Sequence, residues 1–129
     1  MGQSNYDLKK IIVCGDAEET VRAAQELGDN LARRLKTSQI RGIFGTVRRI
    51  EMSWPQNADA EQAKRAWRDV VLLKPKMAYQ TKRNRDVKPL ADVLTDSIDL
   101  VQADWQHFQH FVDFFEAILA YHKAADGKD

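Results

Sequence analysis

The sequence predicts an all-α protein, a single-domain bundle of five to six helices, and three observations favour it. Apolar residues recur at helical spacing through most of the 129 residues, and no segment alternates convincingly with the period of two of a strand. A chain of this length can bury one core. Capping and helix-breaking residues divide it into segments of helical length. We expect residues 1–15 to form an N-terminal arm, with Ile11–Cys14 as a candidate extended piece, and residues 16–129 to form the bundle.

The first helix of the bundle is expected to begin at Asp16, whose side chain can cap it, with Glu19 as the partner three residues later. The helical period continues through Gly28, so we expect one helix to about Leu35. Its inward positions are predicted to be Val21, Ala24, Leu27, Gly28, Leu31 and Leu35.

The second helix is expected to be capped by Thr37 or Ser38 and to run to about Met52. It is amphipathic, and two of its faces differ in chemistry. The predicted core face holds Ile40, Ile43, Phe44, Val47 and Ile50. The predicted outward face holds Thr37, Arg41, Gly45 and Arg48. Arginine binds phosphate in a bidentate manner and glycine permits close approach of a backbone, so the outward face is a candidate anion-binding strip.

A turn at residues 53–57 leads to a third helix, in which Pro75 is expected to cause a break or kink. A short helix over Lys76–Arg83 follows, and its Tyr79 is expected to be a core residue rather than a platform for a base. The predicted inward residues of the third helix are Ala63, Ala66, Trp67, Val70 and Leu73.

Asp86 is expected to cap the next helix, with Pro89 tolerated in its first turn. The last helix should span about Asp104 to Ala124. The predicted core residues of the helix capped by Asp86 are Leu90, Val93, Leu94, Ile98 and Val101. Those of the last helix are Trp105, Phe108, Phe111, Val112, Phe115, Ile118 and Leu119.

The net charge of +1 conceals a strong segregation of charge. Residues 31–50 hold six basic and no acidic side chains, and residues 64–88 hold nine basic and two acidic ones. Residues 89–129 carry a net charge of −6. Two interpretations of this pattern are about equally good. The charges either belong to solvated helix faces, or they bind a polyanion on one side of the protein and a basic partner, including further copies of the chain, on the other.

The single cysteine, Cys14, excludes an internal disulfide and fits a reducing compartment. No apolar run is long enough to span a bilayer, and the N-terminal apolar run Ile11–Cys14 is too short for a secretory signal. We therefore expect a cytoplasmic protein.

Catalytic chemistry has little support in the sequence. His107 and His110 are one turn apart and could bind a metal ion, but no further ligands occur at diagnostic spacing, so solvated helix positions are favoured. His122 is expected to be partly buried. We predict no catalytic residue, no metal and no cofactor. Two alternatives stay open: a small metal-dependent hydrolase that uses His107 and His110, and a helical bundle that binds only proteins.

Three motifs in order resemble one family. Thr37–Arg41 (TSQIR), Leu73–Gln80 (LKPKMAYQ) with Arg83 after it, and Phe115–Lys123 (FEAILAYHK) are similar to segments of the small subunit of type III-A CRISPR effector complexes, the Csm family. The final Gly127–Asp129 is also similar. The resemblance covers roughly residues 20–129, and residues 1–15 are outside it.

The resemblance implies a non-catalytic subunit, several copies of which stack along the guide RNA beside the other Csm subunits and contact target RNA. The contacts carried over by the motifs are Arg41, Lys74, Lys76 and Arg83. Helical geometry adds Arg48 and Arg49, and the basic segment after Pro75 adds Lys82 and Arg85. Because base pairing reads the sequence in RNA-guided effectors, we expect the protein to contact phosphates rather than base edges.

Overall fold

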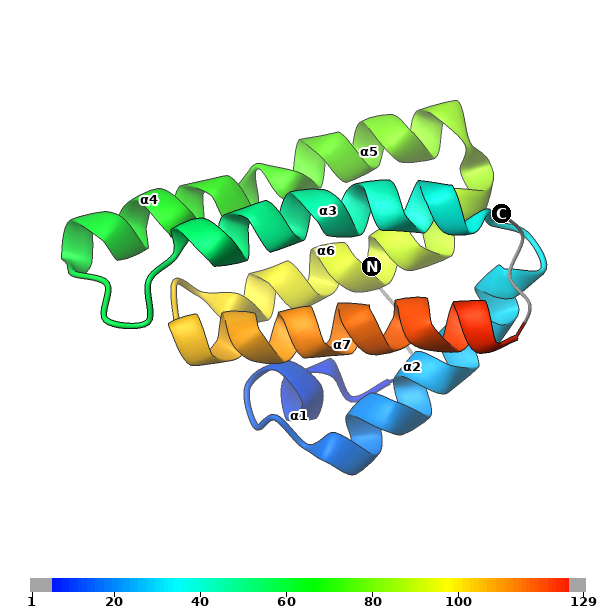
Figure 1. The fold of residues 1–129 in the computed structure, drawn as a ribbon, viewed down its shortest axis with the longest axis horizontal. Coiled ribbons are helices and arrows are strands. Elements are labelled where there is room, and N and C mark those ends of the chain that lie inside the picture. Colours follow the sequence, from blue (N-terminus) through cyan, green and yellow to red (C-terminus); the bar gives the residue numbers. More distant parts are fainter. Residues whose placement is uncertain (1–5, 126–129) are drawn as a thin grey trace.

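The computed structural model describes residues 6–125, and helices account for most of that range (Figure 1). No strand occurs within the described residues, which confirms the predicted all-α single domain. One short N-terminal helix precedes six helices of 11 residues or more. The elements are α1 (Leu8–Ile12), α2 (Ala17–Ala32), α3 (Thr37–Ser53), α4 (Ala60–Val71), α5 (Leu73–Arg83), the 3-10 turn η1 (Arg85–Val87), α6 (Lys88–Val101) and α7 (Trp105–Ala124).

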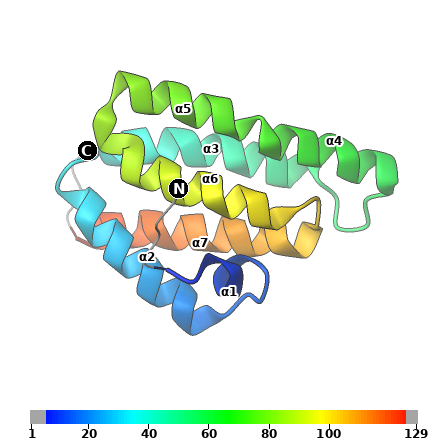
Figure 2. The same ribbon diagram turned by 180° about the vertical axis from the view of Figure 1, so that it is seen from behind.

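Helix α7 lies in the middle of the bundle and packs against α1, α2, α3 and α6. Helices α4 and α5 follow each other almost in line and form an outer layer, with α4 packed on α3 and α5 packed on α6 (Figure 1 and Figure 2). Helices α1 and α2 cover the opposite side of α7. The α4–α5 layer and the α1–α2 layer therefore form two separate outer surfaces.

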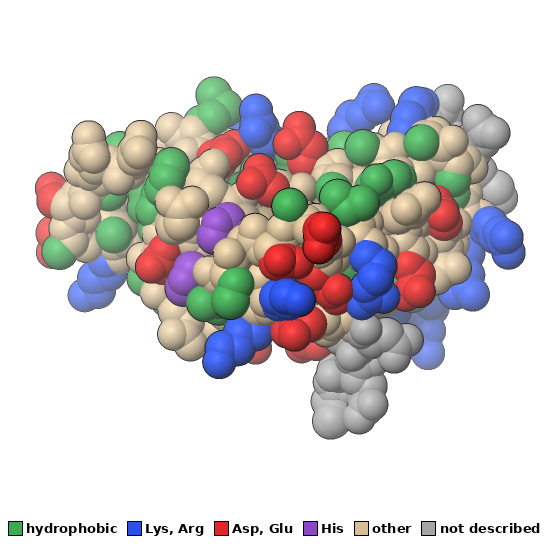
Figure 3. Space-filling view, turned by 90° about the horizontal axis from the view of Figure 1, so that it is seen from below, with side chains coloured by type: hydrophobic (Ala, Val, Ile, Leu, Met, Phe, Trp, Pro, Cys, Tyr) green, Lys and Arg blue, Asp and Glu red, His purple; other side chains and the backbone are tan. Residues whose placement is uncertain are grey.

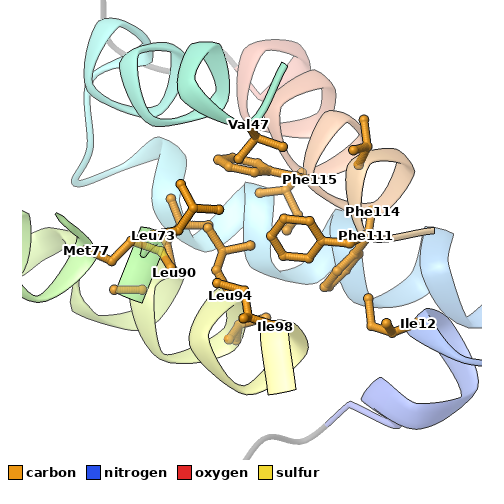
Figure 4. Close-up of a cluster of buried hydrophobic side chains, with 14 of the residues drawn as sticks. Ile12, Val47, Leu73, Met77, Leu90, Leu94, Ile98, Phe111, Phe114 and Phe115 are labelled. Atoms are coloured by element: carbon orange, nitrogen blue, oxygen red, sulfur yellow. The ribbon is translucent and has the colours of Figure 1, made fainter. Parts of the chain in front are cut away.

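Phenylalanine side chains of α7 fill the core, together with leucine and isoleucine residues of α6 (Figure 4). A chain of ring contacts runs through it, from Trp54 on Phe108 at a centroid distance of 5.2 Å to Phe115 on Phe44 at 5.1 Å. Each such contact stabilises the fold by about 0.5–1.5 kcal/mol beyond the area it buries. The fully buried rings of α7 are Phe108, Phe111, Phe114 and Phe115.

The N-terminal segment is helical where an extended piece was expected. The side chain of Asp7 caps α1 by accepting a hydrogen bond of 3.1 Å from the backbone N–H of Lys10. Ile11 and Ile12 are fully buried, and α1 packs on α6 and α7. The apolar run expected to be extended therefore divides: Ile11 and Ile12 end a buried helical turn, whereas Val13 and the exposed Cys14 lie in the turn that follows.

Helix α2 begins as predicted, with the carboxylate of Asp16 accepting a hydrogen bond of 2.9 Å from the N–H of Glu19. It ends at Ala32 rather than at Leu35, although Leu35 stays fully buried in the connection to α3. Gly28 lies inside the helix, as expected. A Cβ atom at Gly28 would come within 2.9 Å of backbone atoms of α7, so glycine permits the two helices to pack closely.

The break between α4 and α5 occurs at Leu72, three residues before Pro75. Pro75 lies in the first turn of α5, where its missing N–H has no intrahelical acceptor to lose. The predicted cap at Asp86 is wrong: the side chain of Asn84 accepts the N–H of Asp86 at 3.0 Å, and Asp86 is part of η1. Pro89 occupies the first turn of α6, as predicted.

Candidate nucleic-acid interface

Helix α3 presents a core face close to the predicted one. Ile40, Val47 and Ile50 are buried, and Ile43 and Phe44 are half-buried against the core. Neither predicted cap is correct: the helix begins at Thr37 itself, and its N-cap residue is Lys36. The backbone N–H of Lys36 donates a hydrogen bond of 3.0 Å to the side-chain oxygen of Gln39.

Thr37 does not share the exposed face of Arg41, in contrast to the prediction. It is 1% exposed, and its hydroxyl lies 3.4 Å from Nδ1 of His122 in α7. Thr37 is therefore a core contact that fixes the start of α3. Arg41 is exposed, and no ion pair to it occurs among the described residues.

The other arginines of α3 have partners within the helix. Arg48 forms an ion pair of 2.7 Å with Glu51, and its guanidinium carbon lies 5.9 Å from the ring centroid of Phe44. Arg49 donates a hydrogen bond of 3.3 Å to the hydroxyl of Thr46. Both guanidinium groups are thereby held close to the helix, and an exposed ion pair like that of Arg48 is weak enough to exchange for a phosphate.

Helix α5 carries four cations and no acidic residue, yet its lysines point to different neighbours. Lys74 forms an ion pair with Asp99 of α6. Lys76 is exposed and lines a hollow next to α3. Lys82 is exposed at the end of the helix, and Arg85 is exposed in η1. The eight predicted contact residues therefore do not form one continuous strip.

Tyr79 is 61% exposed, so the prediction of a core tyrosine is wrong. Met77, two residues earlier, takes the core position and is 2% exposed. The guanidinium carbon of Arg83 lies 5.8 Å from the centroid of the Tyr79 ring, within the range of a cation–π contact. An aromatic ring and a guanidinium group are thus exposed together on α5.

Two adjoining hollows lie between α3 and the α4–α5 layer, and we name them together the α3–α5 groove. One has a volume of about 350 Å³ and the other of about 430 Å³. Thr46 and Lys76 line both, so the two hollows adjoin at these residues. Arg49 lines the second hollow from the α3 side, and one acidic residue, Asp69 of α4, lines it as well. Residues lining the first hollow are Ser38, Gln39, Gly42, Ile43, Thr46, Leu73, Lys76, Met77, Tyr79 and Gln80.

The uncharged residues of this groove are not among the contact residues predicted from the sequence. The spacing of Ser38, Gly42 and Thr46 at i, i+4 and i+8 was a usable signal, because it places three small residues in one row along α3. Gly42 and Gly45 differ from Gly28, since a Cβ atom at either would meet nothing within 4 Å. No contact among the described residues therefore explains either glycine, although each destabilises a helix by about 1 kcal/mol relative to alanine.

The acidic residues of α6 do not all form a surface that faces away from the basic segments. Asp99 pairs with Lys74, and Asp92 pairs with Lys88 at 3.0 Å, so part of the acidic charge is used within the chain.

On the surface that contains α1, α2 and α7, acidic side chains gather at the centre with basic ones beside them (Figure 3).

The three histidines act as helix-to-backbone ties in this structure. Nδ1 of His107 lies 3.2 Å from the carbonyl oxygen of Val101, and Nδ1 of His110 lies 2.8 Å from that of Ile12. His122 is fully buried, rather than partly buried as predicted. Within residues 6–125 no group of three or more side chains that could hold a metal ion occurs.

Within the same range no helix combines the length and apolarity needed to cross a bilayer.

Comparison with known proteins gives one match. The model of the family Csm2 Type III-A matches residues 15–128, which is nearly the whole chain. No curated protein and no solved structure matches it. The match includes all three sequence motifs that carried the resemblance. The similar segment Gly127–Asp129 lies outside the described residues.

Proposed function

Because the chain belongs to the Csm2 family and is a small subunit of the type III-A Csm complex, we propose that it binds RNA through the α3–α5 groove. The observation that carries this proposal is the placement of Arg49 and Lys76. The two cations line one hollow of about 430 Å³, Arg49 from α3 and Lys76 from α5. Two cations that reach into one groove from opposite walls can neutralise adjacent phosphates of one strand.

The chemistry of the groove suits sequence-independent binding. Arg49 and Lys76 supply charge-assisted hydrogen bonds to phosphate oxygens, and Thr46 and Ser38 supply hydroxyl groups. A subunit of an RNA-guided complex has to accept every target, because base pairing with the guide selects the sequence. Contacts to phosphate and ribose meet this requirement.

The remaining candidate residues extend the binding surface to different degrees. Arg41, Lys82, Arg83 and Arg85 are exposed and contact phosphates beyond the groove in this proposal. Arg48 and Lys74 contribute less, because each must first leave its ion pair with Glu51 or Asp99. The chain has no catalytic role in this proposal, and its partners are target RNA, guide RNA, other Csm subunits and further copies of itself.

Contact between copies rests on fewer acidic residues than the sequence indicated, since Asp92 and Asp99 are paired within the chain. Asp96 forms no ion pair among the described residues and is half-buried on α6. We expect Asp96→Lys to reduce the number of small subunits retained per complex, as counted by native mass spectrometry. If the number of small subunits per complex is unchanged, α6 does not take part in the contact between copies.

The experiment that tests RNA binding measures affinity against salt. The full chain is titrated into fluorescein-labelled single-stranded RNA at several salt concentrations, and anisotropy gives the dissociation constant. We expect log K to fall linearly with log salt, with a slope of about −0.7 for each phosphate neutralised, and to be the same for unrelated sequences. A salt-independent affinity, or no binding at low salt, would contradict the proposal. A chain that binds only other Csm subunits would give the latter result.

A further inference from the structure

We propose that the first hollow of the α3–α5 groove receives one unpaired nucleobase of RNA, stacked on Tyr79. This inference rests on the proposed RNA binding and adds a ligand class to it: a base that is not paired, in addition to the phosphates on either side of it. Tyr79 and the residues lining this hollow carry the argument.

The hollow has the size and lining of a small-molecule site. Its volume of about 350 Å³ lies at the lower end of the range of about 300–1,000 Å³ for such sites. Ile43, Leu73 and Met77 give it an apolar floor, and Met77 and Leu73 are only 2% exposed. Gln39 and Gln80 lie in its two walls: the amide of Gln80 can donate and accept hydrogen bonds, and Gln39, whose oxygen accepts from Lys36, can donate through its NH₂ group. An apolar floor with amides at its sides suits a planar heterocycle.

Tyr79 is an aromatic residue at this hollow, and it is one of the few large hydrophobic side chains of residues 6–125 that the fold leaves exposed. It is 61% exposed and lines the hollow, and the guanidinium group of Arg83 lies 5.8 Å from its ring centroid. Exposed aromatic rings next to cations are the platforms on which single-stranded nucleic acids stack their bases. Lys76, also in the lining, is placed to bind the phosphate attached to such a base.

The opposite wall is open at Gly42. A Cβ atom there would meet nothing within 4 Å, so the glycine serves no internal packing, and it lines the same hollow as Tyr79. A bound ring can therefore lie directly against the backbone of α3. The charge of the surroundings selects among occupants, because Lys76 lines the hollow, Arg83 lies against the Tyr79 ring, and none of the described residues in the lining is acidic. That balance favours a nucleotide over the side chain of a partner protein.

The test compares ligands with and without bases and blocks the hollow from each wall. The full chain is titrated into a labelled 12-residue oligouridine and into an abasic ribose-phosphate oligomer of the same length. Tyr79→Leu removes the aromatic face, and Tyr79→Phe keeps it. Gly42→Leu fills the hollow from the α3 side. Gly45→Leu is its matched control, since Gly45 is equally open but does not line the hollow.

We expect the unsubstituted protein and Tyr79→Phe to bind oligouridine more tightly than the abasic oligomer, by about 5- to 150-fold, the range for stacking one base. Tyr79→Leu and Gly42→Leu should lose this preference and bind the abasic oligomer normally. Gly45→Leu should keep the preference. Unfolding midpoints of all variants are measured alongside, and we expect both glycine variants to be at least as stable as the parent protein.

Three results with the variants would overturn the base site. The first is a preference for base-bearing RNA that survives Tyr79→Leu or Gly42→Leu. The second is a loss of preference with Gly45→Leu as large as with Gly42→Leu. The third is loss of the subunit from the purified complex with Tyr79→Leu while RNA preference is unchanged, which would assign the hollow to a partner protein. Salt-dependent binding without any base preference would overturn this inference and leave the proposed function standing, whereas no RNA binding at all would overturn both.

Discussion

Nε2 of His122 donates a hydrogen bond of 2.6 Å to the carbonyl oxygen of Leu35. A carbonyl oxygen only accepts, so the proton of a neutral ring is on Nε2, and Nδ1 can accept from the hydroxyl of Thr37 at 3.4 Å. One buried side chain of α7 thus holds both the end of the α2–α3 connection and the first residue of α3. The tie joins α7 to the N-terminal end of α3, the helix that carries Gly42 and Arg49.

Replacing His122 by phenylalanine should therefore destabilise the protein while keeping the volume of the side chain. The carbonyl of Leu35 would lose its buried donor, which costs about 1–3 kcal/mol of unfolding free energy. Urea unfolding followed by circular dichroism measures the loss. An unchanged midpoint would show that water satisfies the carbonyl and that the tie is not structural.

The glycines of α2 and α3 should respond to alanine in opposite directions. Gly28→Ala places a methyl group within 2.9 Å of the backbone of α7, and we expect a loss of about 1–3 kcal/mol in unfolding free energy. Gly42→Ala is the matched control at an open helix position, and it should stabilise the protein by about 0.5–1 kcal/mol. Thermal unfolding of the two variants gives both signs. A stabilised Gly28→Ala protein would contradict the close packing of α2 on α7.

Glu19 should make the stability of the N-terminal region depend on pH. Hydrogen bonds from Arg22, and then from the backbone N–H of Asp7, lower the pKa of Glu19 from 4.5 to about 2. The folded state therefore binds this proton less readily than the unfolded state, and the stabilisation is present above pH 4.5 and is lost as the pH falls toward 2. Glu19→Gln should be less stable than the parent protein at pH 7. The difference should shrink below pH 4.5 in unfolding experiments, and a difference that stays constant down to pH 2.5 would contradict this assignment.

His107 and His110 should affect stability and not metal content or cleavage. Each donates to a backbone carbonyl, and no group of three side chains that could hold a metal ion occurs among the described residues. We expect the double substitution to glutamine to leave target cleavage by the assembled complex unaltered, and the purified chain to contain no stoichiometric metal by elemental analysis. Zinc that disappears in the double variant would instead support the hydrolase alternative.

Helical periodicity was sufficient to predict the interior of α6. All five of its predicted core residues are buried, because a regular helix between two layers leaves little choice of inward face. The same pattern missed Trp54, which follows α3 in a turn. Its ring stacks on Phe108 and its carbonyl accepts from Trp105 Nε1 at 3.3 Å. Burial of a turn residue is set by tertiary packing, which periodicity does not contain.

The candidate interface was predictable in composition but not in geometry. The sequence located the cations, yet Lys74 turns to Asp99 and Tyr79 turns outward, and neither orientation follows from spacing along one helix. Both depend on α5 packing against α6 and leaving a groove toward α3. The groove exists only between helices, so the sequence could show the row of small residues on α3 but not which residues of α5 lie opposite it.

Cross-linking inside the assembled complex tests the central claim most directly. Target RNA that carries 4-thiouridine is bound to the complex and irradiated, and the cross-linked peptides of this subunit are identified by mass spectrometry. RNA binding in the α3–α5 groove predicts cross-links in residues 38–53 and 73–85, with Tyr79 among them. A variant in which Arg49 and Lys76 are both glutamine should lose these cross-links, whereas the exposed control pair Lys9→Gln and Lys10→Gln on α1 should keep them. Cross-links confined to α1, α2 or α7, or none at all in the small subunit, would contradict the account.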